Sequence, residues 1–335
     1  MFPDLFSTLP ADRIEAVQSA LKQILPGIAI TEISLLSGGL SGSLVYRFAA
    51  ENKNYTLKLN PPAERDSVFS DNLLLASDAG VAPKLYYNNP EQGIIISTFI
   101  DNKPVRGIFS PDQLAVKLAE KIRAMHAVIS HSKVTDLFAT VDGLIDWFKS
   151  TNKLGGVTFE ECFELYGQIK EKYPLERADL VFSHNDLNPN NILCDGKNIW
   201  IIDWDVASIN NRYIDLANAA NYFVHTIEDE NAFLKTYFGK APNDHQKACF
   251  YLMRPVCRII YSLMMFQLAF HAKSADFKHN QEMEGMDMAS FGALIGSGKI
   301  SLAEYDGQLM YGKTLMNTAL AQMRADRFAE SLTNL

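Results

Sequence analysis

The hydrophobic pattern of the chain changes near residue 101, and this change limits the folds that the chain can adopt. Before that point, short runs of alternating apolar and polar residues predict strands, and Leu44–Phe48 and Tyr55–Leu59 predict a β-hairpin. After it, long stretches with apolar residues at helical spacing dominate. The sequence therefore predicts an α+β protein, with a small β-rich lobe over residues 1–100 and a larger, mainly helical lobe over residues 101–335.

Further elements follow from the same two patterns. In the first lobe we expect helices at 11–25 and 67–79 and strands at Leu85–Tyr87 and Ile94–Phe99. In the second lobe we expect helices at 111–129, 159–173, 213–224, 244–272 and 314–332. The first of these has one apolar face, formed by Leu114, Leu118, Ile122, Met125 and Ile129. Asp195-Gly196 is typical of a hairpin turn, here between Ile192–Cys194 and Ile199–Ile202.

Composition excludes several classes of protein. With 335 residues, 47% of them hydrophobic and 21% charged, the chain can bury a core and is unlike a disordered chain or a disulfide scaffold. Its net charge of −8 is unlike the basic surface that nucleic-acid binding requires. The apolar stretch 259–272 is short for a membrane span, the N-terminal residues lack the basic region of a signal peptide, and the cysteines form no C-x-x-C pair. We therefore expect a cytoplasmic protein with no nucleic-acid or membrane partner.

The stretch 181–205 concentrates polar residues that could support chemistry. His184, Asp186 and Asn191 lie on a proline-containing loop between apolar runs, and Asp203 follows the second run. Such groups beside buried strands are costly unless they have partners. Mg²⁺ with a polyphosphate would be such a partner, since Mg²⁺ prefers oxygen ligands. A polar loop that forms hydrogen bonds with itself would explain the same pattern, so on the residues alone both interpretations stay open.

These residues also resemble the signature of a known enzyme family. His184-Asn-Asp186, with Asn191 shortly after it and Ile202-Asp203-Trp-Asp205 further on, is similar to the catalytic signature of the aminoglycoside phosphotransferase and choline/ethanolamine kinase family. Through Ala207–Asn218 the chain is nearer the choline kinase branch. The resemblance implies a protein-kinase-like fold of two lobes. It also implies an ATP- and Mg²⁺-dependent small-molecule kinase that transfers the γ-phosphate to a hydroxyl group of a choline- or ethanolamine-like amino alcohol.

Two alternatives to that function stay open. One is a kinase of the same superfamily with another acceptor, such as thiamine, an aminoglycoside, methylthioribose or a sugar. The other is a kinase-fold protein that binds nucleotide without catalysis.

The resemblance implies roles for individual residues of the second lobe. Asp186 would be the catalytic aspartate, which orients the acceptor hydroxyl and accepts its proton. Asn191 and Asp203 would hold the magnesium ions that bridge the phosphates. His184 and Asp215 would give structural support to the catalytic loop.

The resemblance places the nucleotide contacts in the first lobe. Lys58 occupies the position of the phosphate-binding lysine, although a lysine on the solvent face of a strand would look the same. Thr98 and Ile100 lie on the segment that crosses between the lobes, where backbone groups would meet adenine. The glycine-rich turn before the first strand of the hairpin would approach the phosphates with its backbone N–H groups, although a plain glycine turn is the alternative. Its residues are Gly38, Gly39, Ser41 and Gly42.

One position departs from the family pattern. The family usually pairs the lysine with a glutamate on the following helix, and Phe69 stands at that position here. Among the neighbouring acidic residues Glu64, Asp66 and Asp71, we expect Asp71 to pair with Lys58, because a helical turn or less would bring it to the lysine-facing side.

Four residues are candidates for binding the acceptor, which we expect to be cationic. In choline kinases, a helix similar to Leu252–Met264 closes the amine pocket and often carries two tryptophans. Tyr261 and Met264 stand at the matching positions, and only the tyrosine has a π face for a cation. Trp204 and Asp205 of the signature complete the set, although aromatic residues at helical spacing are usually core.

A second nucleotide-binding pattern occurs near the C-terminus. Gly307–Thr314 matches the P-loop pattern G-x-x-x-x-G-K-[ST]. The P-loop requires a buried strand before it and further α/β units, whereas the preceding Ser301–Asp306 is typical of a helix start. We therefore interpret the match as chance and expect no phosphate contact from Lys313.

Overall fold

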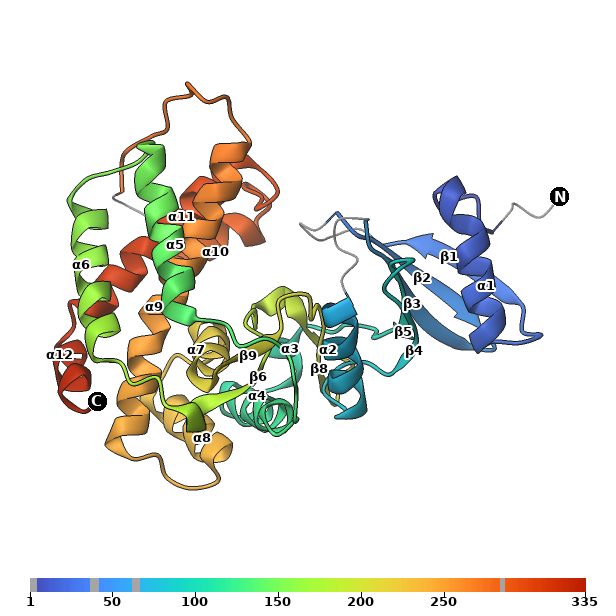
Figure 1. Cartoon of the computed structure of the whole chain (residues 1–335), viewed down its shortest axis with the longest axis horizontal. Coiled ribbons are helices and arrows are strands. Elements are labelled where there is room, and N and C mark those ends of the chain that lie inside the picture. The colour runs from blue at the N-terminus through green and yellow to red at the C-terminus, as the bar shows by residue number, and fades with distance from the viewer. Residues whose placement is uncertain (1–4, 37–41, 62–66, 284–286) are drawn as a thin grey trace.

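The chain forms two lobes of different secondary structure (Figure 1). A computed structural model describes residues 5–36, 42–61, 67–283 and 287–335. The first lobe contains an antiparallel sheet of five strands in the order β1-β2-β3-β5-β4. The second lobe is mainly helical, with short strand pairs at the side that faces the first lobe (Figure 1). The expected α+β, two-lobe architecture is confirmed.

The sheet of the first lobe is built from one predicted hairpin and its neighbours. Its strands are β1 (Ile30–Leu35), β2 (Leu44–Ala50), β3 (Lys53–Leu59), β4 (Leu85–Asn89) and β5 (Ile94–Thr98). Glu51 and Asn52 join β2 to β3 with φ angles of 48° and 59°. Two consecutive residues in the left-handed region are typical of the type I′ turn, whose twist matches that of the two strands.

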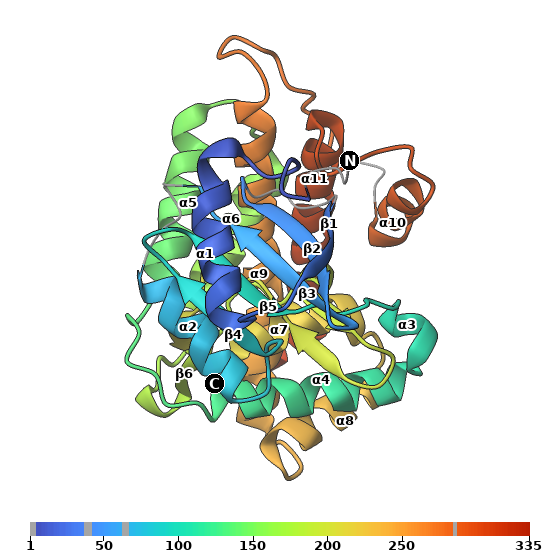
Figure 2. The ribbon, with the colours of Figure 1, turned by 90° about the vertical axis from the view of Figure 1, so that its right-hand side faces the viewer.

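Alternation along β3 decides which side chains face the second lobe. Leu57 and Leu59 are buried in the hydrophobic cluster beneath α1 (Ile14–Ile24), which lies across one face of the sheet (Figure 2). Because successive side chains of a strand point to opposite faces, Lys58 points to the other face. That face is turned toward the segment that carries Asp203 and Asp205, as the ion pairs described below show.

Between the lobes, α2 (Ser67–Asp78) and the crossing segment connect to the helical lobe. Ala76, Val81 and Ala82 belong to the hydrophobic core of the second lobe, although they precede β4 in sequence. The crossing segment is tied to β7 (Ile192–Cys194), because Asn102 Oδ1 accepts the Cys194 N–H at 2.9 Å and the Lys103 N–H donates to the Cys194 carbonyl at 2.8 Å. A domain boundary near residue 101 stays a prediction.

The second lobe is organised around one long helix, α9 (Asp244–His271). It packs against α11, α7, α12 and α5. The remaining elements are α3 (Val105–Ile108), α4 (Pro111–His126), α5 (Leu137–Thr151), α6 (Val157–Lys172), β6 (Leu180–Ser183), β8 (Ile199–Ile201), β9 (Ser208–Asn211), α7 (Arg212–Phe223), α8 (Ile227–Phe238), α10 (Met288–Gly296), α11 (Tyr305–Met323) and α12 (Asp326–Thr333). Two short antiparallel pairs, β6 with β9 and β7 with β8, carry the polar stretch singled out by the sequence.

Three sequence expectations about helices need correction. Ile129 does not extend the apolar face of α4, because the helix ends at His126 and Ile129 is 83% exposed. The helix expected at 314–332 is two helices, α11 and α12. The helices α5, α8 and α10 were not expected.

Helix α9 is longer than the apolar stretch at 259–272. By length and composition it is the one helix among the described residues that could cross a membrane, and 72% of its apolar window is buried inside the protein. This burial is what a core helix shows. All four cysteines are buried and free, as expected for core thiols.

Candidate active site

The loop between β6 and β7 holds the Asp186 carboxylate in a fixed orientation. Asn191 Nδ2 donates to Asp186 Oδ2 at 2.8 Å and to the Asp186 carbonyl at 2.9 Å. Asn188 Nδ2 donates to Asp186 Oδ1 at 3.0 Å. Pro189 begins a short 3₁₀ helix that ends at Asn191, so the chain turns back and brings both amides to the aspartate.

Asp215 stabilises the start of this loop through hydrogen bonds. It lies in the first turn of α7, is fully buried, and accepts from Ser183 Oγ at 2.8 Å and from the His184 N–H at 2.9 Å. His126 Nε2 lies 2.9 Å from the same carboxylate. Burial alone would raise the pKa of Asp215, but the hydrogen bond and charge of His126 and the Ser183 hydrogen bond outweigh it, so the pKa is lowered.

His184 connects the loop to the segment that carries Asp203. Its Nδ1 accepts the Asp186 N–H at 3.2 Å, and the other ring nitrogen, Nε2, donates to the Ile202 carbonyl at 2.9 Å. Both ring nitrogens are thus engaged by backbone groups, which leaves His184 no free nitrogen for chemistry. This geometry agrees with the supporting role that the resemblance implies.

Trp204 is wrong as a candidate acceptor contact. Its side chain is 2% exposed and its ring stacks on Phe182 with centroids 5.6 Å apart. A ring that is enclosed in the core has no face to offer a ligand. Its neighbour on the other side is His184, at 4.8 Å, so Trp204 helps to hold the loop in place.

Lys58 crosses between the lobes and pairs with two carboxylates. Its Nζ lies 3.0 Å from Asp203 Oδ1 and 2.9 Å from Asp205 Oδ2. Burial would lower the pKa of Lys58, but the two carboxylates outweigh it and the pKa is raised. Burial would likewise raise the pKa of Asp203, but the Lys58 ammonium group outweighs burial and the pKa is lowered. The pKa of Asp205 is raised by burial and by the neighbouring Asp203 carboxylate.

The partners of Lys58 correct one expectation. Asp71 is exposed and is not among the ion pairs of Lys58, so the expected Lys58–Asp71 pair is wrong. Asp205 pairs with Lys58, and an acceptor contact by Asp205 stays a prediction. The side chain of Phe69, and the residues Glu64 and Asp66, lie outside the described part of the chain.

A buried amide connects α2 to the second lobe. Asn72 Nδ2 donates to the Ala207 carbonyl at 2.7 Å, and its Oδ1 accepts from Ser132 Oγ at 2.6 Å. Asn72 is fully buried. It therefore ties α2 to the chain just after Asp205.

Asn191 and Asp203 present oxygens that suit Mg²⁺. The Ile202 N–H donates to the Asn191 carbonyl at 3.0 Å, which brings the two residues to neighbouring positions. Because Asn191 uses its amide nitrogen toward Asp186, its Oδ1 is left to coordinate. Among the described residues no group of three or more His, Cys, Asp and Glu could hold a metal ion. Such a sparse set fits Mg²⁺ that takes its other ligands from phosphate and water.

The candidate nucleotide contacts are placed only in part. Gly38, Gly39 and Ser41 lie outside the described residues. An added Cβ on Gly42 would meet only Pro61 Cγ at 3.7 Å, so packing does not require glycine there. The Thr98 N–H donates to the Lys84 carbonyl at 2.9 Å, whereas the Ile100 backbone forms no backbone hydrogen bond within the described ranges.

Beside Asp186, helices α7, α9 and α11 bring tyrosines together. Tyr261 Oη donates to Asp186 Oδ1. The Tyr222 ring lies edge-on to Tyr261 with centroids 6.4 Å apart, and Tyr222 Oη lies 2.9 Å from Tyr311 Oη. Met264, on the next turn of α9, is 44% exposed. Tyr261 thus contacts Asp186 directly, and the acceptor roles of Tyr261 and Met264 stay predictions.

Comparison with known proteins identifies the family of this chain. A sequence profile described as the phosphotransferase enzyme family matches residues 32–251. The chain belongs to this family. The expected family and enzyme class are thereby confirmed, while the identity of the acceptor is not tested.

Individual relatives are more distant. An aminoglycoside 3′-phosphotransferase from Escherichia coli is 26% identical over 240 residues, 64% of this chain and 86% of that protein. A stretch of 65 residues is 45% identical to an uncharacterised protein from Metamycoplasma hominis, of whose length the chain covers 13%.

Solved structures show the same fold. A choline/ethanolamine kinase family protein from Mesorhizobium loti has a TM-score of 0.67 at 17% identity, covering 96% of this chain and 98% of that chain. A spectinomycin phosphotransferase in complex with ADP and spectinomycin has a TM-score of 0.61 at 14% identity, covering 93% and 98%. At such identities the likeness concerns the fold.

Several residues that hold the loop between β6 and β7 were not anticipated from the sequence. Asn185 has a φ of 67° and is held by Asn210, Asn218 and Ser208. Asparagine tolerates the left-handed region better than most residues, so an Asn directly before Asp186 is a usable local signal. His126 gave no such signal, because it lies at the end of an ordinary amphipathic helix.

The P-loop match is not a loop. Gly307–Thr314 lies inside α11, and Lys313 Nζ donates to the carbonyls of Asn280 and Glu282 at 2.6 and 2.7 Å. Both glycines are explained by packing, since a Cβ on Gly312 would come 2.6 Å from the Phe266 ring. The expectation that this match arises by chance agrees with this helical setting.

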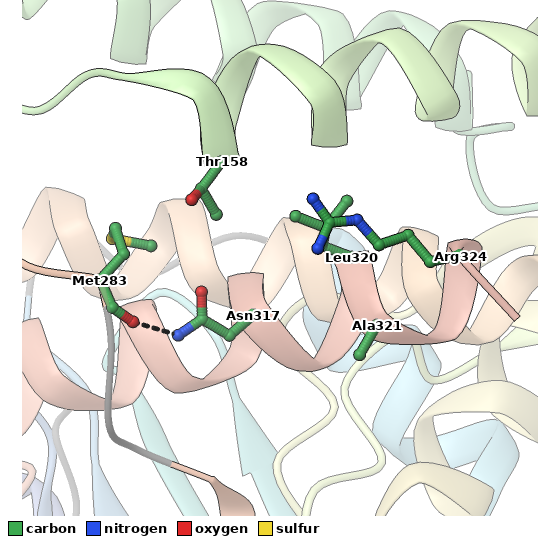
Figure 3. Close-up of a pocket in the computed structure, with 6 residues that line it drawn as sticks. All are labelled: Thr158, Met283, Asn317, Leu320, Ala321 and Arg324. Atoms are coloured by element: carbon green, nitrogen blue, oxygen red, sulfur yellow. Dashed lines mark hydrogen bonds between the residues drawn. The ribbon is translucent and has the colours of Figure 1, made fainter.

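A pocket of about 250 Å³ lies away from the catalytic loop, between α6 and α11 (Figure 3). Its lining residues are Thr158, Met283, Asn317, Leu320, Ala321 and Arg324. Asn317 donates to the Met283 carbonyl and Arg324 pairs with Glu161, so these two side chains already have partners within the protein. None of the candidate catalytic residues lines it.

Proposed function

We propose that the chain is an ATP- and Mg²⁺-dependent kinase that transfers the γ-phosphate to a hydroxyl group of a choline- or ethanolamine-like amino alcohol. The observation that carries this proposal is the ion pair of Lys58 with Asp203 and Asp205 across the two lobes, beside a loop that presents Asp186 and Asn191. One cation, three carboxylates and one amide meet there, which is a set suited to a magnesium–nucleotide complex.

In this proposal the nucleotide lies between the lobes. The Ile100 backbone, together with Thr98, would meet adenine, and Lys58 would bind the phosphates with the turn that contains Gly38, Gly39, Ser41 and Gly42. Asn191 Oδ1 and Asp203 would hold Mg²⁺, which when bound supplies charge neutralisation of the phosphates. Lys58 already lies next to Asp203, so the residues would need little rearrangement.

Asp186 would orient the acceptor hydroxyl and receive its proton. Its orientation is set by Asn188 and Asn191, and the loop beneath it is held by Asp215 and His184. Phosphoryl transfer has a loose transition state, so positioning of this kind supplies much of the catalysis.

Two observations bear on the nature of the acceptor. The amino alcohol is favoured by the motif between Ala207 and Asn218 and by full-length structural likeness to a choline/ethanolamine kinase family protein. An aminoglycoside is the second candidate, because the Escherichia coli relative that covers most of the chain is an aminoglycoside 3′-phosphotransferase. In either case the partner is a small, cationic molecule, and we propose a cytoplasmic enzyme with no nucleic-acid or membrane partner.

An acceptor screen tests the proposal. ADP release is measured with Mg²⁺-ATP over amino alcohols, other amines, aminoglycosides, thiamine and sugars, and turnover stimulated by an amino alcohol is expected. ATP binding without stimulation by any acceptor would favour the non-catalytic alternative, and stimulation by an antibiotic alone would favour the second candidate. Asp186→Asn should lower kcat by roughly 100-fold or more with ATP binding retained. The exposed Asp146→Asn on α5 is the matched control and should behave as the unmodified chain.

A further inference from the structure

We propose that Tyr261 is a positioning residue that determines which oxygen of Asp186 receives the acceptor proton. The reaction part of this inference rests on the proposed function. Tyr261 entered the sequence analysis as an aromatic face for a cation, but its hydroxyl group reaches the carboxylate that we propose as the base.

The hydrogen bonds to Asp186 are distributed unequally between its two oxygens. Oδ1 accepts from Tyr261 Oη and from Asn188 Nδ2. Oδ2 accepts from Asn191 Nδ2. Each carboxylate oxygen has about two acceptor sites. Oδ1 is therefore saturated, and Oδ2 retains one site for a further donor.

Tyr261 is held firmly enough to act in this way. It lies near the middle of α9, the central helix of the lobe, and its ring is bordered by Tyr222, whose own hydroxyl is paired with that of Tyr311. Burial raises the pKa of Tyr261 well above its usual value, and Asp186 adds to this. The phenol thus stays protonated and acts as a donor.

The consequence is an atom-level assignment of the transfer. The acceptor hydroxyl donates to Asp186 Oδ2, and its proton moves there as the hydroxyl oxygen bonds to the γ-phosphorus. The bond between the γ-phosphorus and the bridging oxygen breaks at the same time, and ADP leaves with that electron pair. Loss of the proton from Asp186 to water then restores the carboxylate.

A purely structural role makes a different prediction. If Tyr261 only joined α9 to the loop, its removal would lower stability, and kcat would be unchanged for the protein that remains folded. A positioning role lowers kcat with little change in the KM for ATP, since Tyr261 contacts Asp186 and Tyr222 and neither is a candidate nucleotide contact.

Tyr261→Phe is the direct test because it keeps the ring and removes only the donor. We expect kcat to fall by about 10-fold, the typical effect of losing one hydrogen bond to a charged group, with the KM for ATP unchanged. Tyr173→Phe is the matched control, since it removes a buried phenol that donates to the Cys249 carbonyl of the same helix. An unchanged kcat in Tyr261→Phe would overturn the inference.

A second measurement needs no acceptor. With 3-fluorotyrosine placed at position 261, the ¹⁹F resonance should move when Asp186→Asn replaces the carboxylate, while the same probe at position 173 should not respond. A probe at 261 that ignores Asp186→Asn would contradict the contact itself. If no acceptor is phosphorylated but the resonance moves, the proposed function fails and the positioning contact stands.

Discussion

Asp215 Oδ1 accepts the backbone N–H of Asn185 at 2.8 Å, at the residue directly before the proposed catalytic Asp186. Asn185 has a φ of 67°, in a region that side chains adopt at some cost. The buried carboxylate also holds the N–H of His184 and the hydroxyl of Ser183. The geometry of the loop thus depends on one ionised side chain.

Asp215→Asn should therefore destabilise the protein in a pH-dependent way. At pH 7 we expect the free energy of unfolding to fall by about 2–4 kcal/mol, because the amide places an NH₂ group against hydrogen-bond donors and leaves His126 without its carboxylate. The pKa of Asp215 is lowered in the folded protein. Its stabilising effect is thus complete above the unfolded value of about 3.9 and is lost as the pH falls through the lower folded value.

Urea unfolding of both proteins at a series of pH values measures this. The difference between them should be largest near neutral pH and should shrink below about pH 4. A difference that stays constant down to pH 3 would contradict the assigned role. Asp146→Asn, at an exposed position, controls for a general effect of charge.

Lys58→Met and Asp71→Asn together should distinguish the observed ion pairs of Lys58 from the expected pair with Asp71. Because Lys58 pairs with Asp203 and Asp205, its loss should weaken phosphate binding and lower kcat/KM for ATP by roughly 100-fold. Asp71→Asn should have little effect, since Asp71 is exposed and outside this ion pair. Steady-state kinetics with varied ATP give both values. A comparable loss in Asp71→Asn would show that the lysine changes partner when nucleotide binds.

Two largely buried arginine side chains on α9, Arg254 and Arg258, should respond oppositely to replacement by methionine. Arg254 is compensated by Glu230 at 3.6 Å and by the carbonyls of Ala220 and Val224. Arg258 donates to Gln322, no carboxylate in the described part of the chain pairs with it, and burial lowers its pKa to about 9. An apolar side chain in place of an uncompensated buried charge is often stabilising.

We therefore expect Arg258→Met to be neutral or to raise the free energy of unfolding by about 1–2 kcal/mol, and Arg254→Met to lower it by about 3 kcal/mol. Thermal unfolding of the two variants decides the matter. Equal destabilisation by both substitutions would mean that Arg258 is compensated as well as Arg254.

Gly312→Ala tests the explanation given for the P-loop match. The added Cβ would lie 2.6 Å from the Phe266 ring, so we expect a loss of about 1–3 kcal/mol in stability and unchanged ATP affinity in the folded protein. Gly292→Ala on α10 is the control, because nothing lies within 4 Å of its Cβ and the helix should gain slightly. Loss of ATP binding at unchanged stability would support the P-loop interpretation instead.

The local sequence determined much of this architecture. Alternating and helical periodicities predicted the strands of the first lobe, the hairpin of β2 and β3, and helices such as α4 and α9, because each pattern arises from one face of one element packing on a core. The run from His184 to Asp205 pointed to the family, since its residues resemble the family's signature in type and spacing. These signals lie within a few residues of one another.

The tertiary structure decided which distant side chains meet. Nothing near position 58 shows that Lys58 pairs with Asp203 and Asp205, and nothing near position 261 shows that the tyrosine reaches Asp186. Trp204 likewise entered the core by stacking on Phe182 of β6. Periodicity specifies the face of an element that is buried, but the partner on the opposite side depends on how the lobes and helices pack, which no local pattern records.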